Sequence, residues 1–268
     1  MPRRGRVGGS CIVTKRPIYM LSDGQSNSIG YGTGGRSIDT ANRTNAGDAD
    51  WIPTRVHVWD NAEFQAAADP ATDPGERWRD PVSGARPFNT NGDNNAAVWA
   101  ANAIAADGRD VYLIQTGRGA NGIDNWSVGA NVSSDGDCLR RGRIVWNAAG
   151  LDRPADALIW MQGEADASSF SGYETKHQAM VARYQEVGAL RSDAVIVLVS
   201  LPPAVTNYAS FNTMLSGLAD TYEGGATHGR YIDATDLSTE VGEVHWTGAS
   251  LVTIGERVGA AISDALGL

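Results

Sequence analysis

The chain alternates between short apolar runs and longer segments with helical periodicity. Five runs have the composition of strands, and the last four are nearly continuous in apolar character. That continuity is typical of strands buried on both faces of a parallel sheet. The five runs are residues 17–22, 55–60, 110–116, 156–162 and 194–201.

Between these runs lie segments whose apolar residues recur at the spacing of one helix face. In the last of them Leu251, Ile254, Val258 and Ile262 share such a face, and Thr247 is placed to cap the helix start. The alternation predicts a doubly wound α/β domain with helices on both faces of the sheet. The predicted helices are residues 94–108, 172–190, 211–223 and 247–266.

No repeat or linker divides the chain, so one domain over residues 17–268 is expected after a flexible lead-in over residues 1–16. The lead-in is basic but lacks the apolar core of a signal peptide, and this favours a cytoplasmic location. Residues 32–54 and 66–88 are rich in polar residues, Pro and Gly, and are expected to be long loops. Loops of this length often shape a site.

The composition of the chain limits the classes of partner and ligand that the protein is expected to bind. The 268 residues carry a net charge of −9, which disfavours nucleic acid and anionic membranes but leaves neutral substrates open. No apolar stretch is long enough for a membrane helix. The four histidines show no metal-ligand spacing, so neither a metal nor a cofactor is expected. Cys11 and Cys138 are expected to be free thiols, although a single disulfide between them stays open.

Candidate catalytic and binding residues lie where the predicted strands end, which is where ligands bind in open α/β sheets. Ser26, in "GQSN", directly follows the first strand and could be a nucleophile or a helix cap. Gly30, Gly32 and Gly35 spell G-x-G-x-x-G, but they arrive too far from the strand and a poor helix follows. A dinucleotide site is therefore disfavoured.

Four blocks of sequence together resemble a known family. They are "GQSN", "GANGIDNW", "WMQGEADA" and "VHWTGASLVTIGERV", spread between residues 17 and 264. The set is similar to the SGNH (GDSL-type) hydrolases, and most similar to their sialate O-acetylesterase and acetylxylan esterase branch, carbohydrate esterase family 6. The resemblance implies a three-layer αβα sandwich around a flavodoxin-like, doubly wound sheet of five parallel strands.

The resemblance also implies roles for individual residues. Ser26 matches the nucleophile and His245 the general base. The backbone amide of Ser26, the turn at Gly119 and Ala120, and the side chain of Gln162 match the oxyanion hole. The change from Gly to Ala at position 120 is expected to be mild if φ there stays negative. Substrate contacts are expected from Gln25, Asn27, Trp126, Glu164 and Trp246.

The third member of the triad departs from the family pattern. The family has Asp three residues before the histidine, whereas this chain has Gly242. Glu243 is the nearest carboxylate and is the predicted acid. Glu240, Asp236 and Asp233 lie further upstream, and a Ser–His dyad is also open.

The predicted function is a serine esterase that removes short acyl groups, acetyl above all, from a carbohydrate. The candidate loops are polar, which disfavours a lipid channel, while Trp126, Trp246 and Tyr31 could stack on a sugar. An acidic surface favours a neutral saccharide, although Arg36, Arg118 or Arg140 could clamp an anionic one. Alternatives are a lipid or aryl esterase, or an inactive carbohydrate-binding or virion domain of the same fold.

Overall fold

The computed structural model describes residues 15–29, 55–60, 77–79, 95–225 and 227–268. These residues form a seven-stranded sheet in the order β3-β2-β4-β1-β5-β6-β7. Neighbouring strands pair in parallel, except that β3 runs antiparallel to β2 at one edge. The strands are β1 (Ile18–Gly24), β2 (Val56–Asp60), β3 (Arg77–Arg79), β4 (Val111–Gln115), β5 (Ala155–Met161), β6 (Leu190–Val199) and β7 (His228–Ile232).

The strand order creates a switch point at β1. After β1 the chain forms β2, returns to place β4 directly beside β1, and then crosses to place β5 on the other side. The carboxyl end of β1 is therefore flanked by strands that continue the sheet in opposite directions. Ligands of open α/β sheets bind in the crevice at such a point.

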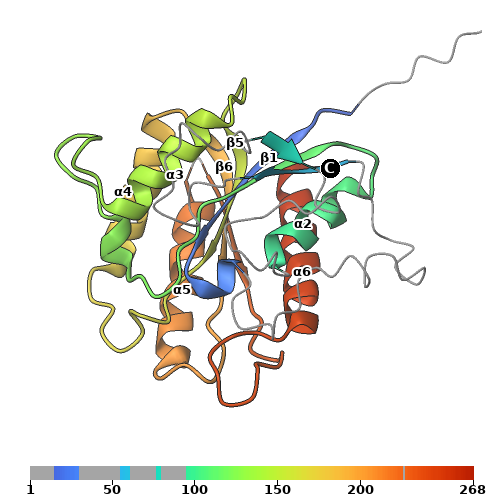
Figure 1. Cartoon of the computed structure of the whole chain (residues 1–268). Coiled ribbons are helices and arrows are strands. Elements are labelled where there is room, and N and C mark those ends of the chain that lie inside the picture. The colour runs from blue at the N-terminus through green and yellow to red at the C-terminus, as the bar shows by residue number, and fades with distance from the viewer. Residues whose placement is uncertain (1–14, 30–54, 61–76, 80–94, 226) are drawn as a thin grey trace, which may run out of the picture.

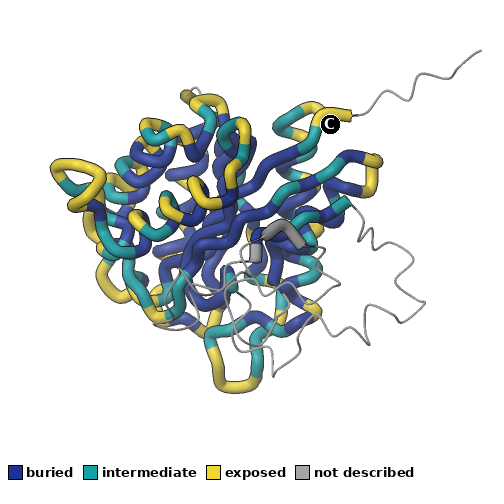
Figure 2. The backbone as a smooth tube through the Cα atoms, turned by 45° about the horizontal axis from the view of Figure 1, so that its top comes forward, coloured by how far each residue is buried: buried dark blue, intermediate teal, exposed yellow. Residues whose placement is uncertain are grey.

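Helices cover both faces of the sheet (Figure 1). The helices α2 (Ala96–Ala105) and α6 (Gly248–Leu266) lie together on one face and share a core with it. On the other face lie α3 (Asp137–Ala148), α4 (Tyr173–Glu186) and α5 (Tyr208–Glu223). The strands β1 and β5, most of β4 and the second half of β6 are buried between these layers, whereas the outer helix surfaces are exposed (Figure 2). The predicted three-layer α/β architecture is confirmed.

The amphipathic pattern at the C-terminus predicts α6 well. Leu251, Ile254, Val258 and Ile262 are all fully buried against the sheet. The predicted cap is present too, because the Thr247 side chain accepts a hydrogen bond from the backbone N–H of Ser250.

The predicted number of strands is wrong. All five predicted strands are present, but β7 and β3 add to them, so that in the described part of the chain six strands are parallel and one is antiparallel. The sequence of β7, "HGRYI", is short and polar, as suits an edge strand with little apolar pattern. Helix α3 was also missed, because its sequence "DCLRRGRIVWNA" carries three arginines and a central glycine.

The end of the predicted lead-in is tied to the domain. Lys15 forms an ion pair with Asp107, and Arg16 forms one with Asp156. Residues 1–14, including Cys11, lie outside the described residues, as do the predicted loop at 32–54 and most of the one at 66–88. Cys138 is a buried free thiol whose pKa burial raises to about 12. Among the helices that the structure describes, none is both long and apolar enough to cross a membrane.

Candidate active site

A tight turn after β1 presents Ser26. Gly24 has φ of +134°, and a Cβ there would lie 2.2 Å from the carbonyl oxygen of Met161 on β5. Only glycine fits such a close approach, so the chain can turn directly into the short 3-10 helix Ser26–Ile29. The backbone N–H of Gln25 donates to Met161 (2.8 Å), which fixes the turn to the neighbouring strand.

A second turn, ahead of α6, presents His245. The backbone N–H of Glu240 donates to the carbonyl of His245 (2.8 Å), and the N–H of Glu243 donates to the carbonyl of Glu240 (3.1 Å). Gly242 adopts φ of +73°, a left-handed conformation that favours glycine. The position where the family pattern has Asp is therefore used to make the turn, and the next residue along, Glu243, carries the carboxylate.

The two turns bring a serine, a histidine and a carboxylate into one hydrogen-bonded chain. The Nε2 atom of His245 lies 3.0 Å from the Ser26 Oγ. Its Nδ1 atom lies 3.0 Å from Oε2 of Glu243. The imidazole is largely buried, at 15% exposure, whereas the Glu243 side chain is 50% exposed. The alternative acid Asp236 is instead paired with Arg257 through two contacts of 2.7 Å.

The turn after β4 lies against the serine. A Cβ built on Gly119 would lie 3.8 Å from the Cβ of Ser26, so this backbone closely approaches the hydroxyl-bearing residue. Ala120 adopts φ of +60°, which corrects the expectation of a negative φ at this position. A non-glycine residue there costs about 1 kcal/mol or more. Among the described residues, the backbone N–H groups of Gly119 and Ala120 donate to no other backbone group.

Gln162 lies beside the site but its side chain is fully buried. Its Oε1 accepts a hydrogen bond from the hydroxyl of Tyr173 (2.6 Å). Its Nε2 donates to a carboxylate oxygen of Asp166 and to the backbone carbonyl of Asn121 (3.1 Å). Both amide hydrogens are used in this arrangement, so an oxyanion contact from Gln162 stays a prediction and would need a changed conformation.

Gln25, Asn27 and Glu164 join the loops to one another. The Oε1 of Gln25 accepts from the backbone N–H of Ala165 (3.2 Å). The Nδ2 of Asn27 donates to Glu164 Oε1 (2.6 Å). Gln25 and Asn27 are only 5% and 3% exposed, so in the described structure their side chains connect the loops of the site and do not face solvent.

The two tryptophans expected to stack on a sugar are core residues. Trp126 is 0% exposed and Trp246 is 1% exposed, so neither ring has a face open to a ligand. The indole N–H of Trp126 donates instead to Asp23 Oδ2 (3.0 Å). This corrects the expectation that Trp126 and Trp246 contact substrate directly. Tyr31 lies outside the described residues.

Asp23 is a buried carboxylate close to Ser26 in sequence that the sequence analysis did not single out. It is fully buried three residues before Ser26, and it also accepts hydrogen bonds from the Tyr184 hydroxyl (2.7 Å) and the Gly24 N–H (2.8 Å). Burial raises its pKa to about 6, although these hydrogen bonds favour the ionised form. Its position directly before the "GQSN" block was the only signal available in the sequence.

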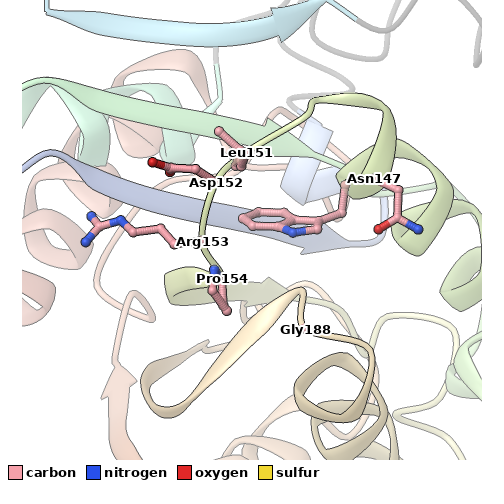
Figure 3. Close-up of a pocket in the computed structure, with 7 residues that line it drawn as sticks. Asn147, Leu151, Asp152, Arg153, Pro154 and Gly188 are labelled. Carbon is pink, nitrogen blue, oxygen red and sulfur yellow. The ribbon is translucent and has the colours of Figure 1, made fainter.

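The structure describes three further candidate features. Arg118 and Arg140 both pair with Asp137. A surface depression lined by residues that include Asp152 and Arg153 lies at the amino end of β5 (Figure 3), whereas Ser26 follows the carboxyl end of β1. In the part of the chain that the structure describes, no three His, Cys, Asp or Glu side chains gather to hold a metal ion.

Fold and site together define a class of protein. A parallel α/β sheet that holds a serine, a histidine and a carboxylate in hydrogen-bonded succession at its carboxyl edge is the arrangement typical of serine hydrolases.

The comparison with protein families gives the particular family. The model of the family "carbohydrate esterase, sialic acid-specific acetylesterase" matches residues 15–264, and the chain belongs to this family. The protein is accordingly a carboxylic ester hydrolase. This confirms the resemblance that the four sequence blocks carry. No relative among curated proteins matches the chain.

Solved structures share the fold at low sequence identity. A protein from Arabidopsis thaliana superposes with a TM-score of 0.64 at 18% identity, covering 92% of this chain and 98% of its own. A carbohydrate acetylesterase from Xanthomonas citri gives 0.62 at 17% identity, covering 94% of this chain and 57% of its own. A carbohydrate acetylesterase family member from Sinorhizobium meliloti gives 0.52 at 14% identity, covering 94% and 100%.

Proposed function

We propose that the protein is a serine esterase in which Ser26 is the nucleophile, His245 the general base and Glu243 the orienting acid. The observation that carries the proposal is the hydrogen-bonded chain, with 3.0 Å from Ser26 Oγ to His245 Nε2 and 3.0 Å from His245 Nδ1 to Glu243 Oε2. A nucleophile in contact with a base that a third group orients is the general arrangement for acyl transfer.

The reaction follows from the geometry. The Ser26 Oγ attacks the ester carbonyl while its proton passes to Nε2 of His245. The backbone N–H groups of Ser26 and Gly119 stabilise the negative charge on the carbonyl oxygen. The alcohol leaves with the proton from His245, which produces an acyl-enzyme. A water molecule, deprotonated by the same imidazole, then releases the carboxylic acid and restores Ser26.

The decisive experiment replaces the nucleophile. Ser26→Ala is expected to lower kcat on p-nitrophenyl acetate at least about 10⁴-fold and to abolish labelling by a fluorophosphonate probe. Ser28→Ala is the matched control, because Ser28 lies in the same 3-10 helix but its hydroxyl donates to the Gln25 carbonyl (2.6 Å). The control is expected to keep more than about a tenth of the activity. Near-normal turnover by Ser26→Ala would exclude Ser26 as the nucleophile.

We infer that the substrate is an acetyl ester on a neutral saccharide. Membership of a carbohydrate esterase family supports a sugar ester. The net charge of −9 disfavours an anionic sugar. Arg118 and Arg140, the described candidates for a clamp on a sugar carboxylate, share the carboxylate of Asp137 with Arg141. Arg36 lies outside the described residues.

The substrate proposal is tested by comparing esters. Acetate release is measured from acetylated xylan and from O-acetylated sialic acid, beside p-nitrophenyl esters of increasing chain length. Activity highest on acetyl esters, with acetate released from the neutral glycan, is expected. Faster release from the sialic acid ester would replace the neutral saccharide by an anionic one. Activity that rises toward long acyl chains, with no acetate released from either glycan, would favour a lipid esterase.

A further inference from the structure

A surface depression of about 240 Å³ lies between the first half of α5 and the end of β7. Helix α5 follows β6 in the parallel part of the sheet, so its first turn lies at the carboxyl edge, as does the end of β7. The depression is therefore at the same edge of the sheet as Ser26, which follows the carboxyl end of β1. The residues that line it include Tyr208, Asn212, Ser216, Tyr231 and Asp233.

The register of the sheet places the depression level with the serine. Asp23 of β1 pairs with Trp160 of β5. Trp160 in turn pairs with Leu198 of β6, and Leu198 pairs with Tyr231 of β7. Tyr231 thus stands in the same row across the sheet as Asp23, which comes shortly before Ser26 in the chain. Neighbouring strands are about 4.8 Å apart, so the distance along the edge from β1 to β7 is roughly 14 Å. A chain of a few sugar units spans such a distance.

The wall formed by α5 is fixed to the loops of the candidate active site. A Cβ built on Gly163, the residue after Gln162, would lie 2.2 Å from Cε1 of Phe211, so the first turn of α5 packs directly against that loop. The side chain of Asn212 holds both backbone groups of Leu201 after β6, because it accepts from the N–H (2.7 Å) and donates to the carbonyl (3.0 Å). The depression is thus formed by well-anchored elements, as is usual for ligand sites.

The lining combines aromatic rings with polar groups. Tyr208 and Tyr231 are both half-buried, and a tyrosine in this position offers an apolar ring together with a polar hydroxyl. Among the described residues, the hydroxyls of Tyr208 and Ser216 have no hydrogen-bond partner. A sugar ring has an apolar face of C–H groups and a rim of hydroxyl groups, so its chemistry matches this lining.

The charge of the lining disfavours an anionic ligand. Among the described residues that line the depression, Asp233 alone is charged. Its Oδ1 accepts hydrogen bonds from the backbone N–H (2.9 Å) and the hydroxyl (2.7 Å) of Thr235, which hold the carboxylate in place. A carboxylate repels a sugar acid but accepts strong hydrogen bonds from the hydroxyl groups of a neutral sugar.

We propose that the depression between α5 and β7 is a second binding site, which holds sugar units of a neutral saccharide distant from the ester that Ser26 attacks. Tyr208 and Tyr231 contact the apolar face of a sugar ring, and Ser216 and Asp233 bind its hydroxyl groups. The inference rests on the proposed function as an esterase of a neutral saccharide. It adds that the preferred substrate is an acetylated oligosaccharide or polysaccharide, because only a longer substrate occupies both places at once.

The test uses two variants of the depression and substrates of two sizes. Ser216→Phe fills the depression, and Tyr208→Ala removes one of its aromatic rings. On acetylated xylan or acetylated glucomannan, whichever releases acetate faster, both variants are expected to raise KM about tenfold with kcat unchanged within about twofold. The reason is that contacts far from the ester bind the ground state and the transition state alike. On p-nitrophenyl acetate and acetylated xylose, which are too short to reach the depression, KM is expected to stay within about twofold.

The matched control is Ser210→Phe, which adds the same side chain at an exposed position of α5 that does not line the depression. It is expected to keep the wild-type KM on every substrate. An unchanged KM for the polysaccharide in Ser216→Phe would overturn the inference, and so would an equal rise in KM for the short esters. If Ser216→Phe lowers the melting temperature by more than about 4 °C, Tyr208→Ala decides by the same two criteria.

The set of substrates separates failure of the second site from failure of the proposed function. If p-nitrophenyl acetate is hydrolysed but no saccharide releases acetate, the proposed saccharide substrate is wrong and the second site with it. If acetylated xylose releases acetate and both polysaccharides do not, the saccharide ester stands and the second site is wrong. If a polysaccharide releases acetate with the wild-type KM in both variants, again only the second site is wrong.

Discussion

Buried carboxylates at the two ends of the central sheet have different kinds of partner. At the amino end Asp156 is fully buried and pairs with three arginines, Arg16, Arg153 and Arg191. At the carboxyl end the structure gives Asp23 only neutral donors as hydrogen-bond partners. The ion pairs of Asp156 at the amino end stabilise the fold. Charge left without a cation at the other end is typical of a functional site, where burial shifts the pKa of acidic groups.

The largest effect is expected at the amino end. Asp156→Asn should lower the free energy of unfolding by about 3 kcal/mol, because three arginines lose the buried charge that they share. The activity of the folded variant should not change. Urea denaturation beside initial rates measures both quantities.

The control for this variant is Asp193→Asn. Asp193 pairs with Arg191 but is 52% exposed, so its loss should cost less than about 1 kcal/mol. If Asp156→Asn lowered activity without lowering stability, the contrast between the two ends would fail.

The second prediction concerns the pH dependence of stability. Burial raises the pKa of Asp23 in the folded protein to about 6 from its ordinary value of 3.8. The folded state therefore binds more protons between these values, and the free energy of unfolding should fall as pH rises through that window, by about 3 kcal/mol. Asp23→Asn should lose this part of the slope. Denaturation of both proteins from pH 4 to pH 7 measures it, and equal slopes would show that Asp23 does not titrate there.

The third prediction concerns the acid at the carboxyl edge. Glu243→Gln should lower kcat about 10²-fold, less than the ~10⁴ typical of a buried triad acid, because Glu243 is half exposed and screened. Glu240→Gln, in the same turn, should lose less than about tenfold. The kcat values of the two variants on p-nitrophenyl acetate show whether Glu243 or Glu240 is the acid. A larger loss in Glu240→Gln would move the acid role to Glu240.

Local pattern predicted most of the fold and the positions of the candidate residues. The five predicted strands and the buried face of α6 are all present, because each is encoded by neighbouring apolar residues. Among the elements that were missed, β7 is short and polar, whereas α3 places Leu139, Val145 and Trp146 on one buried face among three arginines. The limit of local pattern applies also to Trp126 and Trp246, since the sequence does not distinguish an aromatic ring that faces a ligand from one that packs in the core.

The sequence by itself determined that a serine, an amide-rich turn and a histidine follow strand ends, because residue types and strand patterns are local properties. Only the tertiary structure decided which groups meet. Ser26 and His245 are 219 residues apart in sequence and 3.0 Å apart in space. The turn at Gly242 decided that Glu243, and not the paired Asp236, faces the imidazole. The physical reason is that burial and contact depend on how separate strands and loops pack together, which no single stretch of sequence contains.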